Sequence, residues 1–536
     1  MSRRREVRTP PAALWLPPAL LLLALPFAGD LPVLDEESYL FIAESVIESP
    51  GRPYDWWRPW QPWGMQEAAD SFLFAHPPLH LWWVAFWKAL TGTGWGFRLG
   101  VTLLPAALLA ASVGRLAHHV SRRPSTAVLP WLFSPVVVMA VCAGGLPDLA
   151  VTALGTAAVA AWREAQTDRK RVDPRFMAAA GVLLGLAACW KYPALVLVPV
   201  LTLHAWRRGI LRQALPAALG FAVVWGAMEL WLATVYGRVH LLEVLRTAPE
   251  IARGSFLGRG FGVLTRLGLA LSPLLLVVAA LWWRLAVAGL VGSVALALLW
   301  IGPSELSPLG VFLLGVFGAS GTVWVARAVI AVLPADKARR RKNDRDDAFL
   351  LGAWALAVLL GVWFGHNYAG GRYVLPAIAP LALLIARTAE NLAGGKNRLR
   401  VATAAWGLVA VVLADTEARY ANAAEQAAER AIAAHPASRF TGEWTFRWTM
   451  ERAGWTVVRA GEILEPGTLV AVPRNGGGQV QEGWEAIASY EADDPWRVRT
   501  VELEEGVGYH AETLGPLPVG WSTSPLEAVT VYRVTP

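Results

Sequence analysis

The chain has 536 residues, of which 55% are hydrophobic and 17% are charged, and its formal net charge is +7. Many separate apolar runs approach the length that about 30 Å of hydrocarbon requires, so the composition predicts a polytopic α-helical membrane protein and not a soluble one. The basic residues fall in short loops between these runs, which indicates membrane topology and implies no nucleic-acid partner. The two cysteines, Cys142 and Cys189, lie within apolar runs, which excludes a disulfide framework and a cysteine metal site.

The first apolar run, Leu14 to Gly29, follows four arginines and resembles a signal peptide. No small-x-small cleavage pattern precedes Asp30, so we expect an uncleaved first span with its N-terminus in the cytoplasm. The next apolar piece, Leu79 to Leu90, has twelve residues and contains Lys88. It is too short to cross comfortably, which favours a re-entrant or interfacial helix.

With that piece excluded, every strongly basic loop is predicted to lie on the cytoplasmic side of the membrane. These loops comprise residues 122–123, 169–175, 207–212, 337–345 and 396–400. The outer face then receives residues 30–96 as a first outer loop with interfacial helices, and Asp35, Asp148, Lys191 and Arg372 share that face. Counting the loops gives about 13 spans in a membrane domain of residues 1–414.

Beyond about residue 415 the character of the sequence changes. Residues 416–435 have helical composition, and strand-like runs follow at Thr468 to Val472 and at Ala528 to Val534. We therefore predict a small soluble α/β domain at residues 415–536, outside the membrane. Its glycine cluster, residues 475–478, lacks the spacing of a nucleotide fingerprint and is expected to be a plain loop.

Charged side chains next to the apolar runs are the candidate functional residues, because charge is costly near hydrocarbon. Asp35 and Glu36 come soon after the first span and should face water or hold a cation, a phosphate or a reacting hydroxyl. Asp148 begins an apolar run, as a residue that satisfies helix N-terminal N–H groups would. Lys191 has apolar sequence on both sides and needs an anion or a route to water, and Pro193 breaks the helix just beyond it.

Five motifs occur in the order seen in one superfamily: LDEESYLFIAES, AHPPLHLWWVAF, GLPDLAVTALG, WKYPALVLVP and GRYVLPAIAPLALL. Together they resemble the GT-C membrane glycosyltransferases, over roughly residues 12–390. The likeness is greatest to family 39, the protein O-mannosyltransferases, and to the lipid A aminoarabinose transferases. The later string FTGEWTFRWTMERAGW is similar to the tail of bacterial members.

The resemblance implies transfer of a sugar from a polyprenyl-phosphate carrier to an acceptor hydroxyl, usually with inversion. The acceptor is a lipid, a protein or a polysaccharide, at the outer face of a bacterial-type cytoplasmic membrane. In the matching motif Asp35 is the base, and Glu36 orients Asp35, binds acceptor or contributes to a cation site. Asp148 corresponds to a second outer-face carboxylate that holds acceptor or shapes the catalytic site.

Several further residues are predicted to bind substrate. Lys191 and Arg372 would hold the carrier phosphate, with Tyr373 donating a further hydrogen bond. Tyr39 shares a helical face with Asp35 and would line the sugar pocket, unless it anchors that helix among headgroups. His76 stands before two prolines at a rigid corner, as a binding residue or a structural one. Whether a divalent metal is needed stays open, with Glu36 and His76 as its candidate ligands.

Each of these charged residues also has an explanation that involves no function. Asp35 and Glu36 would be solvated loop acids, Lys191 a lysine that snorkels to the interface, and Arg372 with Tyr373 an interfacial anchor. Two other functions also remain open. The chain could be a transporter or flippase of a lipid-linked substrate, although its motif residues collect on one face. It could equally be a non-catalytic glycan-binding membrane protein, which would tolerate loss of Asp35.

Overall fold

The computed structural model describes most of the chain. The described residues are 11–24, 26, 31–32, 34–57, 71–73, 76–166, 172–251, 255–272, 284, 286–292, 294–295, 307–333, 342–366, 368–392, 394–459 and 461–536.

The membrane part is built from helices. In chain order they are α1 (Pro11–Ala24), α2 (Glu36–Glu48), η2 (Ser71–Leu73), α3 (Pro78–Thr91), α4 (Trp95–Val120), α5 (Pro124–Ala127), α6 (Leu129–Leu132), α7 (Pro135–Cys142), α8 (Pro147–Glu164), α9 (Pro174–Trp190), η3 (Tyr192–Val196), α10 (Leu197–Arg208), η4 (Arg212–Ala214), α11 (Leu215–Tyr236), α12 (His240–Ile251), α13 (Phe256–Leu271), α15 (Pro308–Val332), α16 (Lys342–Gly365), α17 (Gly371–Glu390) and α18 (Gly395–Ala434).

Within the described residues, six helices are long and apolar enough to cross a membrane. The pair of segments 124–132 and 135–142, bent by 66°, would make a seventh span. Helices α1 and α9 are apolar but shorter, and part of the chain that the prediction counted, residues 273–283 and 296–306, lies outside the described residues. A multispanning helical protein is therefore confirmed, whereas the number of about 13 spans is not.

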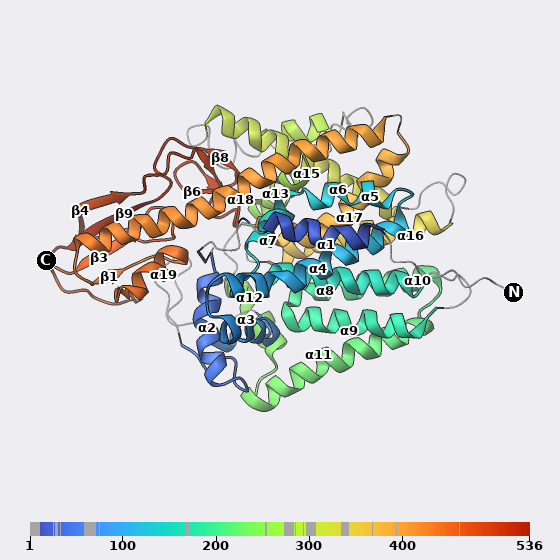
Figure 1. The fold of residues 1–536 in the computed structure, drawn as a ribbon, viewed down its shortest axis with the longest axis horizontal. Coiled ribbons are helices and arrows are strands. Elements are labelled where there is room, and N and C mark those ends of the chain that lie inside the picture. Colours follow the sequence, from blue (N-terminus) through green and yellow to red (C-terminus); the bar gives the residue numbers. More distant parts are fainter. Residues whose placement is uncertain are drawn as a thin grey trace.

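The helices run roughly side by side, and the two ends of the bundle differ (Figure 1). Helices α2, α3 and α12 lie at the end that also carries the C-terminal sheet, while the ends of α10, α5 and α16 lie at the opposite end. Helix α3 has 14 residues and packs against α2 and α4, as expected for a piece too short to span. Residues 237–262, whose charge pattern is compatible with an amphipathic helix or a flexible loop, include α12 and the start of α13.

Ion pairs tie the helices together at the end away from the sheet. Arg163 of α8 meets Asp347 of α16 at 2.8 Å, with both side chains buried, and Arg207 of α10 lies 3.6 Å from Asp346. The Glu390 carboxylate at the end of α17 accepts from the backbone N–H of Arg122 and of Arg123. Buried charges here are paired, as a low-dielectric interior requires.

Small residues let neighbouring helices approach closely, which is how membrane helices pack without a hydrophobic driving force. A Cβ at Gly268 of α13 would lie 1.8 Å from the Phe317 carbonyl oxygen of α15, and a Cβ at Gly321 would lie 2.0 Å from that of Leu264. The same reciprocal contact joins α9 to α11, where a Cβ at Gly181 would lie 1.9 Å from the Ala217 carbonyl oxygen. These interfaces fix the frame that carries the site.

The C-terminal part contains a five-stranded sheet in the order β2-β1-β3-β9-β4. Strand β1 pairs in parallel with β2 and β3, while β9 is antiparallel to both β3 and β4. The C-terminal half of α18 and α19 cover it, burying Phe440, Phe446, Met450 and Trp455. The elements are β1 (Arg439–Phe440), α19 (Trp444–Arg452), β2 (Thr456–Val457), β3 (Leu469–Pro473), β4 (Trp484–Glu491), β5 (Val498–Arg499), β6 (Val501–Glu502), β7 (Val507–Gly508), β8 (Gly520–Trp521) and β9 (Ala528–Val534).

Both predicted strands are present, as β3 and β9, and the glycine cluster is a loop between β3 and β4 as expected. Helix α18 is continuous across residue 415, so the proposed boundary between membrane and soluble parts falls inside one helix. This helix physically joins the bundle to the sheet (Figure 1).

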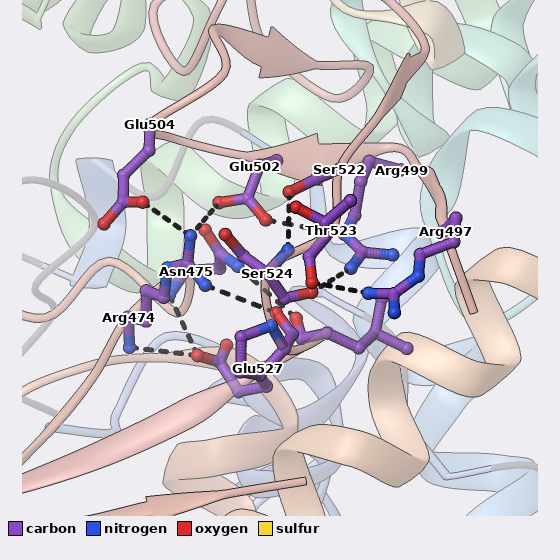
Figure 2. Close-up of polar contacts among 12 residues, drawn as sticks. Arg474, Asn475, Arg497, Arg499, Glu502, Glu504, Ser522, Thr523, Ser524 and Glu527 are labelled. Atoms are coloured by element: carbon purple, nitrogen blue, oxygen red, sulfur yellow. Dashed lines mark hydrogen bonds and ion pairs between the residues drawn. The ribbon is translucent and has the colours of Figure 1, made fainter. Parts of the chain in front are cut away.

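A buried polar network holds the loops at one end of the sheet (Figure 2). Arg474 pairs with Glu502 at 3.0 Å and with Glu504 at 2.7 Å, and Arg499 donates to the Ser524 carbonyl. The fully buried Glu527 carboxylate accepts from the backbone N–H groups of residues 474, 475 and 528 and from the Tyr420 hydroxyl. Burial raises the pKa of Glu527 to about 7, although these donors act in the opposite direction.

The raised pKa of Glu527 makes the stability of this domain depend on pH. Between the usual glutamate pKa of 4.5 and about 7, the folded state binds a proton that the unfolded state has released. We therefore expect stability to fall as pH rises through this window, by about 3 kcal/mol in total. Hydrogen exchange of β3 and β9 amides in the full-length protein, corrected for intrinsic rates, measures this change in stability.

Glu527→Gln should flatten this pH dependence, because the amide does not titrate. Glu485→Gln, on an exposed position of β4, is the matched control and should leave the wild-type dependence intact. Protection that is constant or rises between pH 4.5 and 7 in the wild type would contradict the assignment.

Candidate active site

Asp35 lies at the start of α2 with its carboxylate turned away from its own helix. Leu34 adopts a left-handed backbone, with φ of 53°, which redirects the chain just before Asp35. The Asp35 side chain makes no capping bond to α2 and instead accepts from Arg372 Nη2 at 2.8 Å. It keeps 23% of its side-chain surface exposed, so this carboxylate faces both a cation and solvent.

Lys191 and Asp148 form a second, more deeply buried pair at 2.8 Å. Helix α9 ends at Trp190 and Lys191 adopts an extended backbone before η3, so the helix break ahead of Pro193 projects the ammonium sideways. Lys191 is only 3% exposed, which argues against a snorkelling lysine. Asp148 lies in the first turn of α8, where the helix dipole favours a carboxylate, but among the described residues its carboxylate accepts a hydrogen bond from Lys191 and not from a helix N–H group.

Arg372 links the two pairs into one row of alternating charges, Lys191–Asp148–Arg372–Asp35. Its Nε lies 3.9 Å from Asp148 Oδ2. Its Nη2 also donates to the hydroxyls of Tyr368 and Tyr373, at 3.1 and 3.0 Å. Four residues from four different parts of the chain thus meet, and the prediction that they share one face is met by direct contact among them.

The C-terminal domain positions the start of α17, where Arg372 lies. Gly371 N donates to the Tyr509 carbonyl at 2.9 Å, and Glu512 N donates to the Ala369 carbonyl at 3.0 Å. Arg266 of α13, fully buried, donates to the carbonyls of Gly508, Gly515 and Pro516. The segment from residue 507 to 517 is thereby held in place against the membrane helices, directly beside the row of charges.

A cavity of about 390 Å³ lies between α8, η3, α12, α16 and α17. Its walls are mostly apolar, with Val151, Leu241, Val244 and Val358 among them. Its polar residues include Asp148, Lys191, Arg372, Tyr373, His76 and His366. A long apolar space that has two cations in its wall suits a ligand with an apolar body and an anionic head.

Tyr39 and His76 lie next to each other. Their rings stack with centroids 6.0 Å apart, and the His76 carbonyl accepts from the Tyr54 hydroxyl at 2.7 Å. His76 lines the cavity. Tyr39 is 3% exposed, meets the edge of His80, and lies near enough to Asp35 and Arg372 to interact with them electrostatically.

Glu36 points away from Asp35. Its carboxylate accepts from Arg98 at 2.7 Å and from the Gly145 N–H at 2.8 Å, and it is 3% exposed. It therefore fixes α2 against the loop before α8, and through that loop it positions Asp148. This differs from the expectation that Glu36 orients Asp35 directly, binds acceptor or holds a cation.

The described residues include no cluster that matches the metal site left open by the sequence. Among the residues that the structure describes, no three His, Cys, Asp or Glu side chains are placed to hold a metal ion. Glu36 faces Arg98 and His76 faces the cavity, so these two candidate ligands do not converge.

The sequence reasoning missed several residues of the site. His366 stacks on Tyr373 with ring centroids 3.9 Å apart, Tyr368 accepts from both Arg372 and Tyr373, and Arg98 pairs with Glu36. The signal available for His366 and Tyr368 was their place in the short loop before Arg372. For Arg98, the available signal was a charge inside an apolar helix that had no assigned partner.

No family model matches the chain, and no curated protein sequence matches it. Solved structures do: ArnT from Cupriavidus metallidurans bound to undecaprenyl phosphate, at 16% identity and TM-score 0.42, over 84% of this chain and 86% of that one. The Archaeoglobus fulgidus oligosaccharyltransferase in complex with Zn and sulfate matches at 13% identity and TM-score 0.45, over 83% of this chain and 62% of that one. Similarity at these identities and TM-scores does not establish an activity.

The buried pair Asp148–Lys191 should show its cost when one partner is removed. Lys191→Met leaves the Asp148 charge without its closest partner in a dry interior, so we expect a loss of about 3–5 kcal/mol in the free energy of unfolding. Adding Asp148→Asn should recover at least half of that loss. Denaturant titration in mixed micelles, followed by tryptophan fluorescence, measures both variants.

Lys88→Met is the control: the Lys88 side chain is 11% exposed and donates to the Leu40 carbonyl, but its ion-pair partner Glu44 is 64% exposed and stays hydrated when the lysine is removed. Its loss should be smaller, about 1–2 kcal/mol, because no charge is left buried. Equal losses in the free energy of unfolding for the two single lysine variants, or no recovery in the double variant, would show that the stability does not depend on keeping the buried Asp148–Lys191 pair intact.

Proposed function

We propose that this protein is a membrane glycosyltransferase that moves a sugar from a polyprenyl-phosphate carrier to an acceptor hydroxyl, at the bundle end that carries the C-terminal domain. The observation that carries the proposal is the apolar cavity of about 390 Å³ with Lys191 and Arg372 in its wall. A polyprenyl chain would occupy the apolar part, and its phosphate would lie against the two cations. The cavity's placement between membrane helices supports entry of such a carrier from the bilayer.

The charges of the empty site are balanced, with Lys191 and Arg372 facing Asp148 and Asp35. A phosphodiester entering between the cations would compete with both carboxylates for them. Arg372 suits this exchange, since its guanidinium can bind two phosphate oxygens while the Tyr373 hydroxyl donates a further bond. Binding of the sugar donor would then weaken the hold of Arg372 on Asp35.

Release of Asp35 would convert an ion-paired carboxylate into an available base. In the step that we propose, the acceptor oxygen forms a bond to the anomeric carbon as the bond from that carbon to the phosphate oxygen breaks. The hydroxyl proton passes to Asp35, and the carrier leaves as its phosphate, whose growing charge Lys191 and Arg372 stabilise. Attack opposite the leaving phosphate inverts the anomeric centre.

Asp148, Tyr373 and His366 act in this scheme as the surroundings of the phosphate. Asp148 keeps Lys191 charged and oriented until the phosphate arrives, and the His366 ring, stacked on Tyr373, fixes the direction of its hydroxyl. Glu36 and Tyr39 position Asp148 and the His76 corner from behind.

The first experiment measures transfer from a panel of radiolabelled polyprenyl-phosphate sugars into total membrane material, with wild type and Asp35→Asn. Because a general base contributes typically about 10²–10⁴-fold, the variant should lose at least about a hundredfold in rate. Its affinity for undecaprenyl phosphate should be retained or higher, because the phosphate no longer competes with the Asp35 carboxylate for Arg372. Asp55→Asn is the matched control, since Asp55 lies in the same outer region and pairs with Arg52.

Transfer that persists in Asp35→Asn would remove Asp35 as the base. A wild type that binds undecaprenyl phosphate but transfers no sugar from any donor would favour the flippase or glycan-binding alternatives instead.

A second prediction concerns the cavity. Gly361 of α16 lines it, and Gly361→Phe would place a ring in the space assigned to the polyprenyl chain. We expect undecaprenyl phosphate to bind about tenfold more weakly or worse, as measured by native mass spectrometry or tryptophan quenching.

Gly226→Phe on α11 is the control, because a Cβ there meets nothing within 4 Å. If Gly361→Phe binds undecaprenyl phosphate as the wild type does, the carrier lies elsewhere.

A further inference from the structure

A second, smaller cavity borders the same Asp148–Arg372 contact. It has a volume of about 30 Å³ and lies between α7, α8, α17, α18 and the segment at Tyr509 and His510 of the C-terminal domain. We call it the Glu417 chamber after the acidic residue of α18 in its wall. Asp148 and Arg372 line both this chamber and the large cavity, so the two spaces share these residues.

Glu417 and His510 form a pair that no step of the proposed reaction uses. His510 Nε2 lies 2.9 Å from Glu417 Oε2, and the two residues are 8% and 6% exposed. An ionised carboxylate only accepts, so this contact places a ring proton on Nε2. The pair joins the C-terminal domain to α18 at the chamber wall.

Four buried polar atoms of residues that line the chamber have no hydrogen-bond partner among the described residues: Asp148 Oδ2, Arg372 Nε, Glu417 Oε1 and His510 Nδ1. Asp148 Oδ2 and Arg372 Nε lie 3.9 Å from each other, which is too far for a direct hydrogen bond. Buried polar groups are nearly always paired, so these atoms indicate a polar occupant. Carboxylate oxygens accept and a guanidinium N–H donates, and a hydroxyl group, which does both, matches them.

The size of the chamber limits the occupant. About 10–15 Å³ of such volume holds one water, so about 30 Å³ admits one water or one hydroxyl with its carbon, and no larger group. Its outer wall is made of small side chains that are only partly buried, Ala140, Cys142, Ala143 and Ala418. These residues offer an approach from outside between α7 and α18.

We infer that the Glu417 chamber binds one hydroxyl of the acceptor, and that the acceptor is therefore a polyhydroxylated glycan headgroup and not a protein side chain. The inference rests on the proposed function. Asp35 does not line the chamber, so the hydroxyl held there is distinct from the one that reacts. A serine or threonine side chain has a single hydroxyl and cannot fill both places, whereas a sugar has several.

This assignment gives the C-terminal domain a part in binding the acceptor. His510 lies in the segment that Arg266 holds against the bundle, next to the backbone bond between Gly371 and Tyr509. Glu417 and His510 would be acceptor-binding residues, placed so that a bound glycan meets the carrier phosphate across Asp148 and Arg372.

The test uses the full-length protein in nanodiscs, the active donor from the panel, and membrane extract separated into glycan, glycolipid and protein fractions. Glu417→Gln and His510→Asn should each raise the apparent KM for the labelled fraction about tenfold, the value of one hydrogen bond. Undecaprenyl phosphate binding should stay within about twofold of wild type. His435→Asn, which removes the partner of Tyr490 elsewhere in the domain, is the control and should change neither quantity.

Cys142 gives a second measurement that needs no folded variant at position 417 or 510. Its thiol is not in a disulfide and lines the chamber wall, and methyl methanethiosulfonate would add a small group there. The reagent should lower transfer without affecting undecaprenyl phosphate binding, and Cys142→Ala should be insensitive to it. Membrane extract that contains acceptor should protect the thiol.

The outcomes separate the two proposals. Label in the glycan or glycolipid fraction, with KM raised in both variants, supports the inference. Label in the protein fraction, or variants and modified Cys142 that behave as wild type, overturns it and leaves the proposed function standing, with only water in the chamber. A wild type that transfers no sugar overturns both.

Discussion

The row Lys191–Asp148–Arg372–Asp35 is the constraint on which the rest of the site depends. Its members come from the break after α9, the first turn of α8, the start of α17 and the start of α2, and each charge faces one of opposite sign. Charges this deeply buried are stable only while they are paired. The row therefore fixes the relative positions of four chain segments. In the proposed reaction, its two cations would also bind an incoming anion.

The C-terminal domain forms part of the surroundings of this row. Helix α18 runs without a break from the bundle to the sheet, and the segment near His510 lies against the start of α17 (Figure 1). Arg266, buried among carbonyls of that segment, would be left unpaired without it, which is costly for a guanidinium. The domain is thus part of the site's wall and not an appendage.

The two spaces beside the row differ in size and in the charged residues of their walls. The large one is mostly apolar, with Lys191 and Arg372 in its wall, and suits a lipid carrier, while the Glu417 chamber is small, also mostly apolar, and has Glu417 and His510 in its wall. Asp148 and Arg372 belong to both. In the proposed reaction, the lipid-borne sugar and the hydroxylated acceptor would meet at this charged contact.

The sequence by itself determined that the chain spans a membrane many times and that β3 and β9 are strands, and it predicted that Asp35, Asp148, Lys191 and Arg372 share one face, because apolar length, strand pattern and isolated charges are local signals. The direct contact among these four residues came from the tertiary structure. It could not assign partners. That Glu36 belongs to Arg98, that Tyr39 lies behind His76, and that His366, Glu417 and His510 reach the site was decided by helix packing and by the fold of the C-terminal segment. Such contacts join residues tens to hundreds of positions apart, and no local pattern encodes them.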